Sequence, residues 1–198
     1  MLVLGLTGSV GMGKSTCAEM FAALGVPIFN ADREVHRLYS GPAVPLIEAA
    51  FPGTVVDGAV DRGRLGDAVF DNPPAMAKLE QIVHPLVRES EIAFRKGATA
   101  EGSRIVLLDI PLLFEAGGES RVDIAIVVST APEVQKTRVM RRPGMTEERF
   151  AAISEKQMPD AEKRRCAHFI IDTTGSFDDT LRQVADVLRA VAGIAAGG

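Results

Sequence analysis

Hydrophobic positions near the N-terminus alternate between a short continuous run and a helical pattern. The apolar run from Leu2 to Leu6 predicts a buried strand, and a glycine-rich loop follows at 8–13. An amphipathic helix is predicted from Ser15 to about Leu24, and Gly25 is placed to end it as a C-cap. A second short strand is predicted at 26–30. Strand, helix and strand in this order form a βαβ unit, which predicts a parallel sheet with a right-handed crossover.

The rest of the chain continues this alternation and predicts an α/β fold. The segment from about Glu34 to Arg95 has a mainly helical pattern. Two continuous apolar runs, 105–109 and 123–129, predict buried strands of a parallel sheet. We also predict a helix at 133–140, a last strand at 169–172, a last helix at 177–191 and a frayed tail at 195–198. We expect the helical segment to be broken into pieces by Pro42, Pro45, Pro52, Pro73 and Pro74.

Composition and charge are those of an ordinary globular protein. The chain has 198 residues, 46% hydrophobic and 24% charged, which suits one domain with a real core. Its net charge is −4 with both signs spread along the chain, so no basic block predicts nucleic-acid binding. The N-terminus lacks the pattern of a signal peptide and no stretch approaches a membrane span, so we expect a cytoplasmic protein that does not enter a membrane.

The two cysteines, Cys17 and Cys166, lie far apart in the sequence and in no CxxC pair. This spacing gives no support to a structural zinc site. We expect both to be reduced residues in or near the core.

The loop after the first predicted strand fits the phosphate-binding pattern G-x-x-x-x-G-K-[ST] as Gly8-Ser-Val-Gly-Met-Gly-Lys14-Ser15. Its glycines let backbone N–H groups turn toward phosphates, and the positive end of the following helix dipole points at the same anions. The pattern predicts that the Lys14 ammonium reaches the β- and γ-phosphates of ATP and that the Ser15 hydroxyl coordinates Mg²⁺. The predicted nucleotide-binding residues are Gly8, Gly11, Met12, Gly13, Lys14, Ser15 and Thr16.

A phosphate loop alone leaves two classes open, a phosphotransferase and a nucleotide-operated binding protein. The Asn-Lys-x-Asp segment of a GTP switch is missing, because the only asparagines, Asn30 and Asn72, do not begin one. The Leu-Ser-Gly-Gly-Gln signature of a transport ATPase is missing too. The short length, an early carboxylate and a late arginine-rich segment favour a small-molecule kinase.

Three further features each have a functional and a structural interpretation. Asp32, just after the second strand, is placed either to accept a proton from an attacking hydroxyl or to cap the next helix. Asp109, at the end of a strand, either supports Mg²⁺ through water or bonds to backbone. Arg138, Arg141 and Arg142 either close over ATP or form a solvated helix face.

The motifs together resemble the dephospho-CoA kinase family. The opening Gly5-Leu-Thr-Gly8 through Lys14-Ser-Thr16 is similar to the start of that family, and Phe29-Asn-Ala-Asp32 stands where the family usually has Asp-Ala-Asp. The segments His84-Pro-Leu-Val-Arg88 and Asp109-Ile-Pro-Leu-Leu-Phe-Glu115 are similar to two further family segments. Matches continue through Gln135, Arg138, Met140, Arg141, Gln157-Met-Pro159 and 163–172, so the resemblance runs from about residue 4 to 176.

The resemblance implies ATP-dependent phosphorylation of the ribose 3′-hydroxyl of 3′-dephospho-CoA, the last step of CoA biosynthesis. It also implies a P-loop NTPase fold, an α/β three-layer sandwich with a parallel sheet. The single kinase domain would have a core (1–33, 101–136 and 165–198), a helical CoA-side segment at about 34–100 and a small lid at about 137–164. Asp32 then becomes the favoured general base and Arg141 the lid arginine, with Lys14 as the third catalytic residue. The substrate-binding residues implied are Asp32, His84, Arg88, Leu112, Leu113, Phe114 and Glu115, and Ser15 and Asp109 are the implied Mg²⁺ residues. We favour a monomer.

The chain departs from the family pattern at three positions. Asn30 replaces the first aspartate, which leaves Asp32 as the sole candidate base there. His36 stands where an arginine is common, beside Arg37. Ile153 stands where many members have a late-lid arginine, and Arg149, one helical turn earlier, is a possible substitute. The alternatives are another small-molecule P-loop kinase, acting for example on a nucleoside or its monophosphate, and a nucleotide-dependent binding protein without transfer activity.

Overall fold

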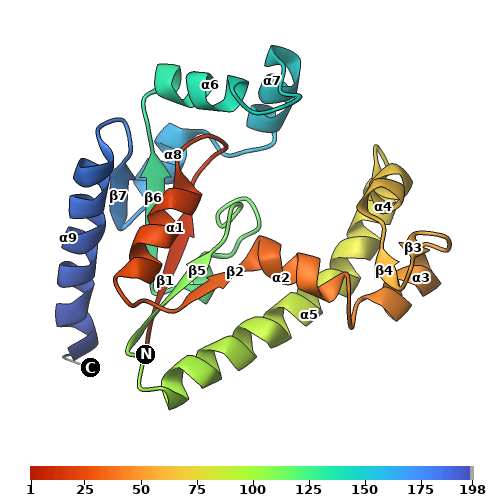
Figure 1. Cartoon of the computed structure of the whole chain (residues 1–198), viewed down its shortest axis with the longest axis horizontal. Helices are drawn as coiled ribbons and strands as arrows, with labels where there is room; N and C mark the ends of the chain where they lie inside the picture. The colour runs from red at the N-terminus through yellow and green to blue at the C-terminus, as the bar shows by residue number, and fades with distance from the viewer. Residues whose placement is uncertain (197–198) are drawn as a thin grey trace. The chain divides into compact units, whose positions relative to one another are not determined.

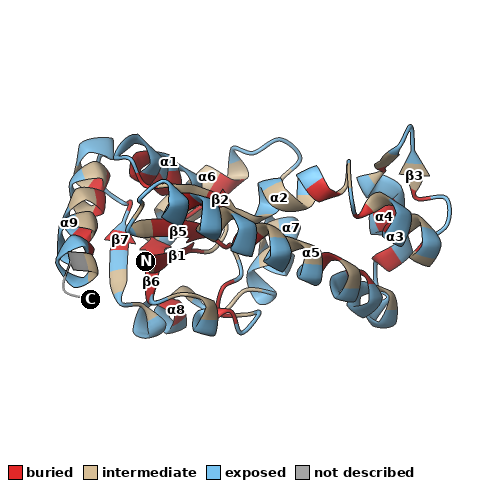
Figure 2. Ribbon diagram, turned by 90° about the horizontal axis from the view of Figure 1, so that it is seen from below, coloured by how far each residue is buried: buried red, intermediate tan, exposed pale blue. Residues whose placement is uncertain are grey.

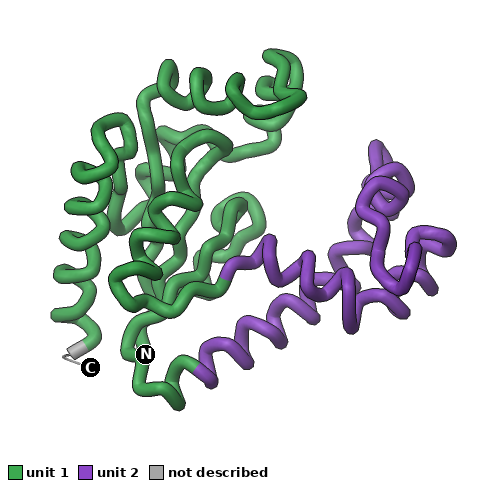
Figure 3. The backbone as a smooth tube through the Cα atoms, viewed as in Figure 1, with its two compact units in different colours: residues 1–29, 98–198 green, residues 30–97 purple. Residues whose placement is uncertain are grey.

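The computed structural model describes residues 1–196, and the chain divides into two compact units. Unit 1 contains residues 1–29 together with the segment that begins at Ala98, and unit 2 contains residues 30–97 (Figure 3). Each unit has its own hydrophobic core. Of the helices in the described residues, none is long and apolar enough to cross a membrane.

Unit 1 is built around a parallel sheet of five strands in the order β2-β5-β1-β6-β7. The first strand, β1, pairs with β5 from Leu2 beside Ile105 to Leu6 beside Asp109, and it pairs with β6 on its other side. The loop after β1 therefore leaves the middle of the sheet at its carboxyl edge, where α/β proteins place ligand sites. The strands are β1 (Leu2–Thr7), β2 (Ile28–Asn30), β5 (Ile105–Asp109), β6 (Ile124–Ser129) and β7 (Phe169–Asp172).

Helices cover both faces of this sheet, which confirms the predicted three-layer α/β fold. Helices α1 (Lys14–Ala23) and α9 (Phe177–Ala196) pack against each other and share one core with the strands. Helix α8 (Asp160–Cys166) contacts β6, and Figure 2 shows α1 and α8 on opposite sides of the strands. The side chains of β6 are all buried, as expected for a central strand covered on both faces. This unit also contains η1 (Glu119–Arg121), and the helices α6 (Pro132–Met140) and α7 (Glu147–Glu155), which are labelled in Figure 1.

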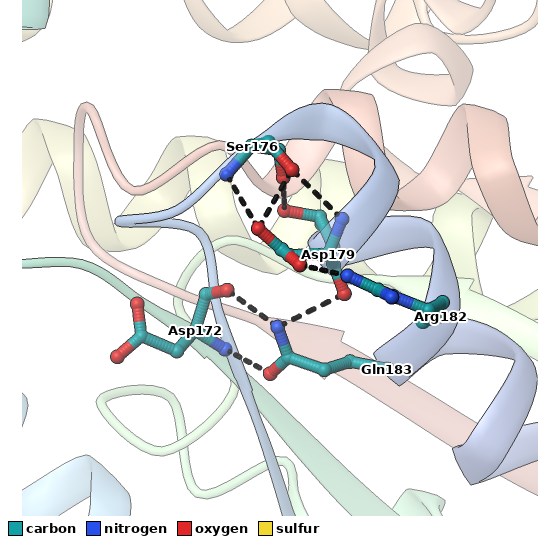
Figure 4. Close-up of polar contacts among 6 residues, drawn as sticks. Asp172, Ser176, Asp179, Arg182 and Gln183 are labelled. Atoms are coloured by element: carbon teal, nitrogen blue, oxygen red, sulfur yellow. Dashed lines mark hydrogen bonds and ion pairs between the residues drawn. The ribbon is translucent and has the colours of Figure 1, made fainter.

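The start of α9 is fixed by a reciprocal pair of hydrogen bonds. The Ser176 hydroxyl accepts from the N–H of Asp179 at 3.1 Å, and the Asp179 carboxylate accepts from the N–H of Ser176 at 3.1 Å (Figure 4). This is a capping box with aspartate in the third position, which satisfies two N–H groups at the helix start. Nearly two turns into α9, the Gln183 amide holds both the N–H and the carbonyl of Asp172 at 2.8 Å each. The last strand and the last helix are thereby tied together.

Unit 2 is mainly helical but contains a small hairpin that the sequence pattern did not predict. Its helices are α2 (Ala31–Leu38), α3 (Val44–Ala50), α4 (Arg62–Val69) and most of α5 (Pro73–Ala100). Strands β3 (Val55–Val56) and β4 (Ala59–Val60) pair antiparallel around Asp57 and Gly58, which both have positive φ. Leu38, Ile47, Phe51, Leu65 and Val83 belong to its buried core.

The helical segment is divided into α2, α3, α4 and α5 as expected, and Pro45 and Pro73 lie in the first turns of α3 and α5, where the missing N–H costs nothing. Two other expectations about local structure are wrong. Ala195 is helical because α9 continues to Ala196, while Gly197 and Gly198 lie outside the described residues. Cys17 is buried as predicted, but Cys166, at the end of α8, is exposed.

Candidate functional site

The glycine-rich loop joins β1 to α1, as its sequence context predicted. Gly11 and Gly13 have φ of 81° and 90°, a region that side chains rarely adopt. Gly8 passes so close to β6 that a Cβ there would lie 2.6 Å from the carbonyl oxygen of Val128. Gly13 directly precedes the first residue of α1, Lys14, and the next side chains, Ser15 and Thr16, are exposed. The loop thus opens a helix N-terminus at the carboxyl edge of the sheet, which is an anion-binding arrangement.

Lys14 and Asp109 form an ion pair that joins the loop to the end of β5. The Asp109 side chain is only 1% exposed and that of Lys14 14%, so the pair is largely shielded from solvent. The sequence had suggested that Asp109 either supports Mg²⁺ through water or bonds to the backbone. The ion pair with the lysine of the loop is a third kind of contact. A carboxylate beside the loop and the exposed Ser15 hydroxyl are hard oxygen donors of the kind that Mg²⁺ prefers. Within residues 1–196, no group of three or more His, Cys, Asp or Glu side chains is arranged to hold a metal ion without a ligand's help.

A hollow of about 340 Å³ lies beside the phosphate loop in unit 1. Gly13 and Thr16 line it from the loop and the start of α1, and Phe177, 62% exposed, adds an aromatic ring to the lining. Arg138 lies on its wall and donates to the hydroxyl and the carbonyl of Thr173 at 2.8 and 2.7 Å. Thr173, which follows the last strand, also lines this hollow.

The arginine-rich segment contributes unequally to this hollow. Arg138 and Arg142 line it, whereas Arg141, at the end of α6, is exposed and is not among its lining residues. Arg149, the suggested substitute for a late-lid arginine, donates to the carbonyl of Gly144 at 2.6 Å. Ile153 lies half-buried on α7. The transfer role of Arg141 stays a prediction.

Glu115 connects the segment after β5 to the start of α8. Its carboxylate pairs with Lys163, whose side chain is 0% exposed, at 2.8 Å, and accepts from the N–H of Met158 at 2.9 Å. Burial raises the pKa of Glu115, but the hydrogen bonds from Lys163 and Met158 outweigh it and hold the pKa below its ordinary value. Of the other residues predicted in this segment, Leu113 and Phe114 are buried and Leu112 is exposed.

Asp32 lies in the first turn of α2 in unit 2, and it does not cap that helix. The cap is Asn30, whose side chain accepts from the N–H of Arg33 at 2.7 Å. The structural interpretation of Asp32 as an N-cap is therefore wrong. Its carboxylate is exposed and can contact a ligand. The substitution of asparagine at position 30 is also explained, because Asn and Asp cap helices about equally well.

A second hollow, of about 470 Å³, has Asp32 on its wall. Its lining combines apolar side chains such as Leu65 and Val69 with polar groups from His36, Tyr39 and Arg62. Tyr39 and Arg62 belong to no motif in the sequence, so nothing there could have indicated them. His84 and Arg88 lie four residues apart on α5, both exposed and both outside this set of lining residues.

The parallel sheet, the loop after its first strand and the paired Lys14 and Asp109 define a P-loop nucleotide-binding protein. The family model for dephospho-CoA kinase matches residues 2–179. A dephospho-CoA kinase from Brucella melitensis is 58% identical over 98% of this chain and 96% of its own length. The chain belongs to the dephospho-CoA kinase family.

Two solved structures share the fold of this chain. The crystal structure of TT1252 from Thermus thermophilus superposes with a TM-score of 0.85 at 33% identity, over 96% of both chains. A dephospho-CoA kinase from Campylobacter jejuni superposes with a TM-score of 0.66 at 27% identity, also over 96% of both chains.

Proposed function

We propose that this chain transfers the γ-phosphate of ATP to the ribose 3′-hydroxyl of 3′-dephospho-CoA, giving CoA and ADP in the last step of CoA biosynthesis. The observation that carries this function is the phosphate loop with Lys14 held beside Asp109, in a chain that matches the dephospho-CoA kinase family over residues 2–179. The loop supplies ATP binding and the family supplies the acceptor.

On the ATP side, the loop N–H groups and the Lys14 ammonium hold the phosphates. Ser15 and Asp109 would hold Mg²⁺, which supplies charge neutralisation on the phosphates when bound. The hollow beside the loop suits the nucleoside, since Phe177 and the Arg138 guanidinium offer flat surfaces for a base. Before ATP binds, the ion pair with Asp109 compensates the charge of the Lys14 ammonium. When ATP binds, Lys14 leaves this pair and contacts the phosphates.

On the acceptor side, Asp32 takes the proton of the 3′-hydroxyl as the new P–O bond forms. Its support is an exposed carboxylate that does not cap its helix and that borders a hollow of about 470 Å³. As the family resemblance implies, further acceptor contacts are proposed for His84, Arg88, Leu112, Leu113, Phe114 and Glu115. We further propose that Arg141 moves onto the transferring phosphoryl group when the segment 137–164 closes over ATP and excludes water.

We place this reaction in the cytoplasm and propose that the monomer carries it out. The first proposal rests on the reaction. The second rests on the fact that all the residues given a role above belong to one chain. Size-exclusion chromatography with light scattering at working concentration would test the second.

The deciding experiment measures ADP release from ATP and Mg²⁺ with 3′-dephospho-CoA, adenosine, AMP or no acceptor, and identifies the product by mass. We expect rapid turnover with dephospho-CoA alone, giving CoA. Turnover with AMP or adenosine instead would identify a different small-molecule kinase. ATP binding without transfer to any of these acceptors would overturn the proposal and favour a nucleotide-dependent binding protein.

A further inference from the structure

The backbone of the phosphate loop is held by side chains from distant parts of unit 1. The N–H of Val10 donates to Gln157 Oε1 at 3.1 Å, and Gln135 Nε2 donates to the carbonyl of Val10 at 2.8 Å. The Thr173 hydroxyl donates to the carbonyl of Met12 at 2.8 Å. Both backbone groups of Val10 are thus taken by two glutamines, which fixes the peptide planes on either side of it.

The two glutamines have opposite hydrogen-bonding roles that their partners dictate. A backbone N–H can only donate, so Gln157 must present its oxygen, and a carbonyl can only accept, so Gln135 must present its nitrogen. The amide orientations therefore follow from the partners and not from an arbitrary choice. The two positions should respond differently to the same change of side chain.

The glutamines flank residues 136–156, most of which belong to the segment 137–164 predicted to close over ATP. Gln135 lies on α6, and Gln157 lies between α7 and α8. Within the segment, Lys136 of α6 and Glu147 of α7 form an ion pair at 2.8 Å. The residue after Gln157, Met158, is bound in turn by Glu115. A displacement of either end would therefore act on the same residue of the loop.

Helix α6 packs tightly against the loop at Gly11. A Cβ at Gly11, the residue after Val10, would lie 2.5 Å from Val139 Cγ2 and 3.1 Å from the carbonyl oxygen of Gln135. A side chain at position 11 would therefore collide with Val139 and crowd the carbonyl of Gln135, so the loop lies directly against α6 at this point. The shape of the loop and the position of α6 are consequently set together.

We propose that Gln135 and Gln157 are positioning residues that hold the phosphate loop in its phosphate-binding shape from the two ends of the segment 136–156. A loop that is already shaped loses less conformational entropy when ATP binds, so the two amides increase affinity without touching the nucleotide. The inference rests on the proposed use of ATP but not on the identity of the acceptor, so it can be tested by ATP binding alone.

The experiment measures the Kd for ATP, kcat, and the KM for each substrate in four single variants, the double methionine variant and one control. Gln135→Met and Gln157→Met remove each hydrogen bond while keeping a side chain of similar size. Gln157→Glu keeps an oxygen acceptor for the N–H of Val10, whereas Gln135→Glu replaces the donor with an acceptor that faces a carbonyl. Both glutamates add the same charge, so a difference between them reports the direction of the hydrogen bond.

We expect each methionine variant to raise the Kd for ATP about three- to tenfold, the range for one net hydrogen bond. The KM for dephospho-CoA should stay within about twofold of the unchanged protein. Gln157→Glu should recover most of the ATP affinity, and Gln135→Glu should bind ATP at least as weakly as Gln135→Met. The double methionine variant should lose less than the product of the two single losses, because both amides hold the same residue.

Gln183→Met provides the matched control. Gln183 also holds both backbone groups of one residue, Asp172, but it does so at the start of α9 and not at the loop (Figure 4). It should lower the melting temperature without changing the Kd for ATP. An unchanged Kd in both methionine variants, equal behaviour of the two glutamate variants, or an equal loss of affinity in Gln183→Met would each overturn the proposal. If a methionine variant fails to fold, the two glutamate variants still decide it.

Discussion

Gly11 illustrates how a single residue links the phosphate loop to its surroundings. Its φ of 81° disfavours any side chain, and a Cβ would also overlap Val139. We expect Gly11→Ala to lower the free energy of unfolding by roughly 2–5 kcal/mol, from backbone strain and overpacking together, and to weaken ATP binding. Urea unfolding and ATP titration measure the two effects.

Gly25 offers a matched control for that substitution. Its φ is 86°, yet a Cβ there meets nothing within 4 Å. Gly25→Ala should therefore cost only the backbone strain, about 1–2 kcal/mol, and leave ATP binding unchanged. Equal losses in the two variants would mean that contact with α6 does not constrain the loop.

Asp32 carries the proposed proton transfer, and the substitution Asp32→Asn tests it. We expect kcat to fall by about a hundredfold or more, because the amide cannot accept the proton, while the Kd for ATP stays unchanged. Since Asn30 caps α2, the fold should be unaffected. Steady-state kinetics and ATP titration make the comparison, with Asp67→Asn, on an exposed carboxylate of α4, as the control. A kcat near that of the unchanged protein would remove Asp32 as the base.

Among the elements, α9 depends on the capping box of Ser176 and Asp179. We expect Ser176→Ala to destabilise the protein by about 1 kcal/mol, through loss of a helix cap. Thermal unfolding without ATP measures this effect, and Ser40→Ala, on an exposed serine after α2, should leave the melting temperature nearly unchanged. Equal melting temperatures for Ser176→Ala and the unchanged protein would show that the box contributes little.

The same capping box should make α9 sensitive to acid. The hydrogen bonds from Ser176 lower the pKa of Asp179 below its ordinary value of 3.8. The stabilising contribution is therefore complete above pH 3.8 and is lost as the pH falls through the lowered pKa. The difference in stability between Asp179→Asn and the unchanged protein should accordingly shrink in that window.

At the scale of the whole molecule, Cys17 reports the opening of unit 1. Burial raises its pKa from 9.0 to about 12, with a smaller opposing effect of the Arg138 charge. A thiol reagent at neutral pH should modify the exposed Cys166 quickly and Cys17 only after unfolding. Peptide mass analysis distinguishes the two, and rapid modification of both in the native protein would contradict a closed core.

The raised pKa of Cys17 also predicts a loss of stability in alkali. The contribution of the buried Cys17 thiol to the free energy of unfolding is present in full below pH 9.0, where the thiol of the unfolded chain is still neutral. It declines as the pH rises from 9.0 toward about 12, because only the unfolded chain can release the proton. Cys17→Ala should show a smaller decline over this range in urea unfolding, measured against Cys166→Ala.

The sequence alone determined the sheet and the phosphate loop of this protein. The buried strands could be predicted because short continuous apolar runs are typical of strands covered on both faces. The loop could be predicted because its glycines and Lys14 have the spacing that a backbone wrapped around phosphates requires. The family could be recognised from ordered motifs, and the comparisons confirmed it. The hairpin at 55–60 was missed, because two strands of two residues each leave too little periodic pattern to detect.

Only the tertiary structure decided which side chains meet. The ion pair of Lys14 with Asp109, the burial of Lys163 against Glu115, and the hold of Gln135 and Gln157 on Val10 join residues far apart in the chain. It also decided that Asn30, and not Asp32, caps α2. Such contacts depend on how whole elements pack. They could not be predicted from the sequence, because the residues concerned are polar and such residues are found mostly on the solvated surface.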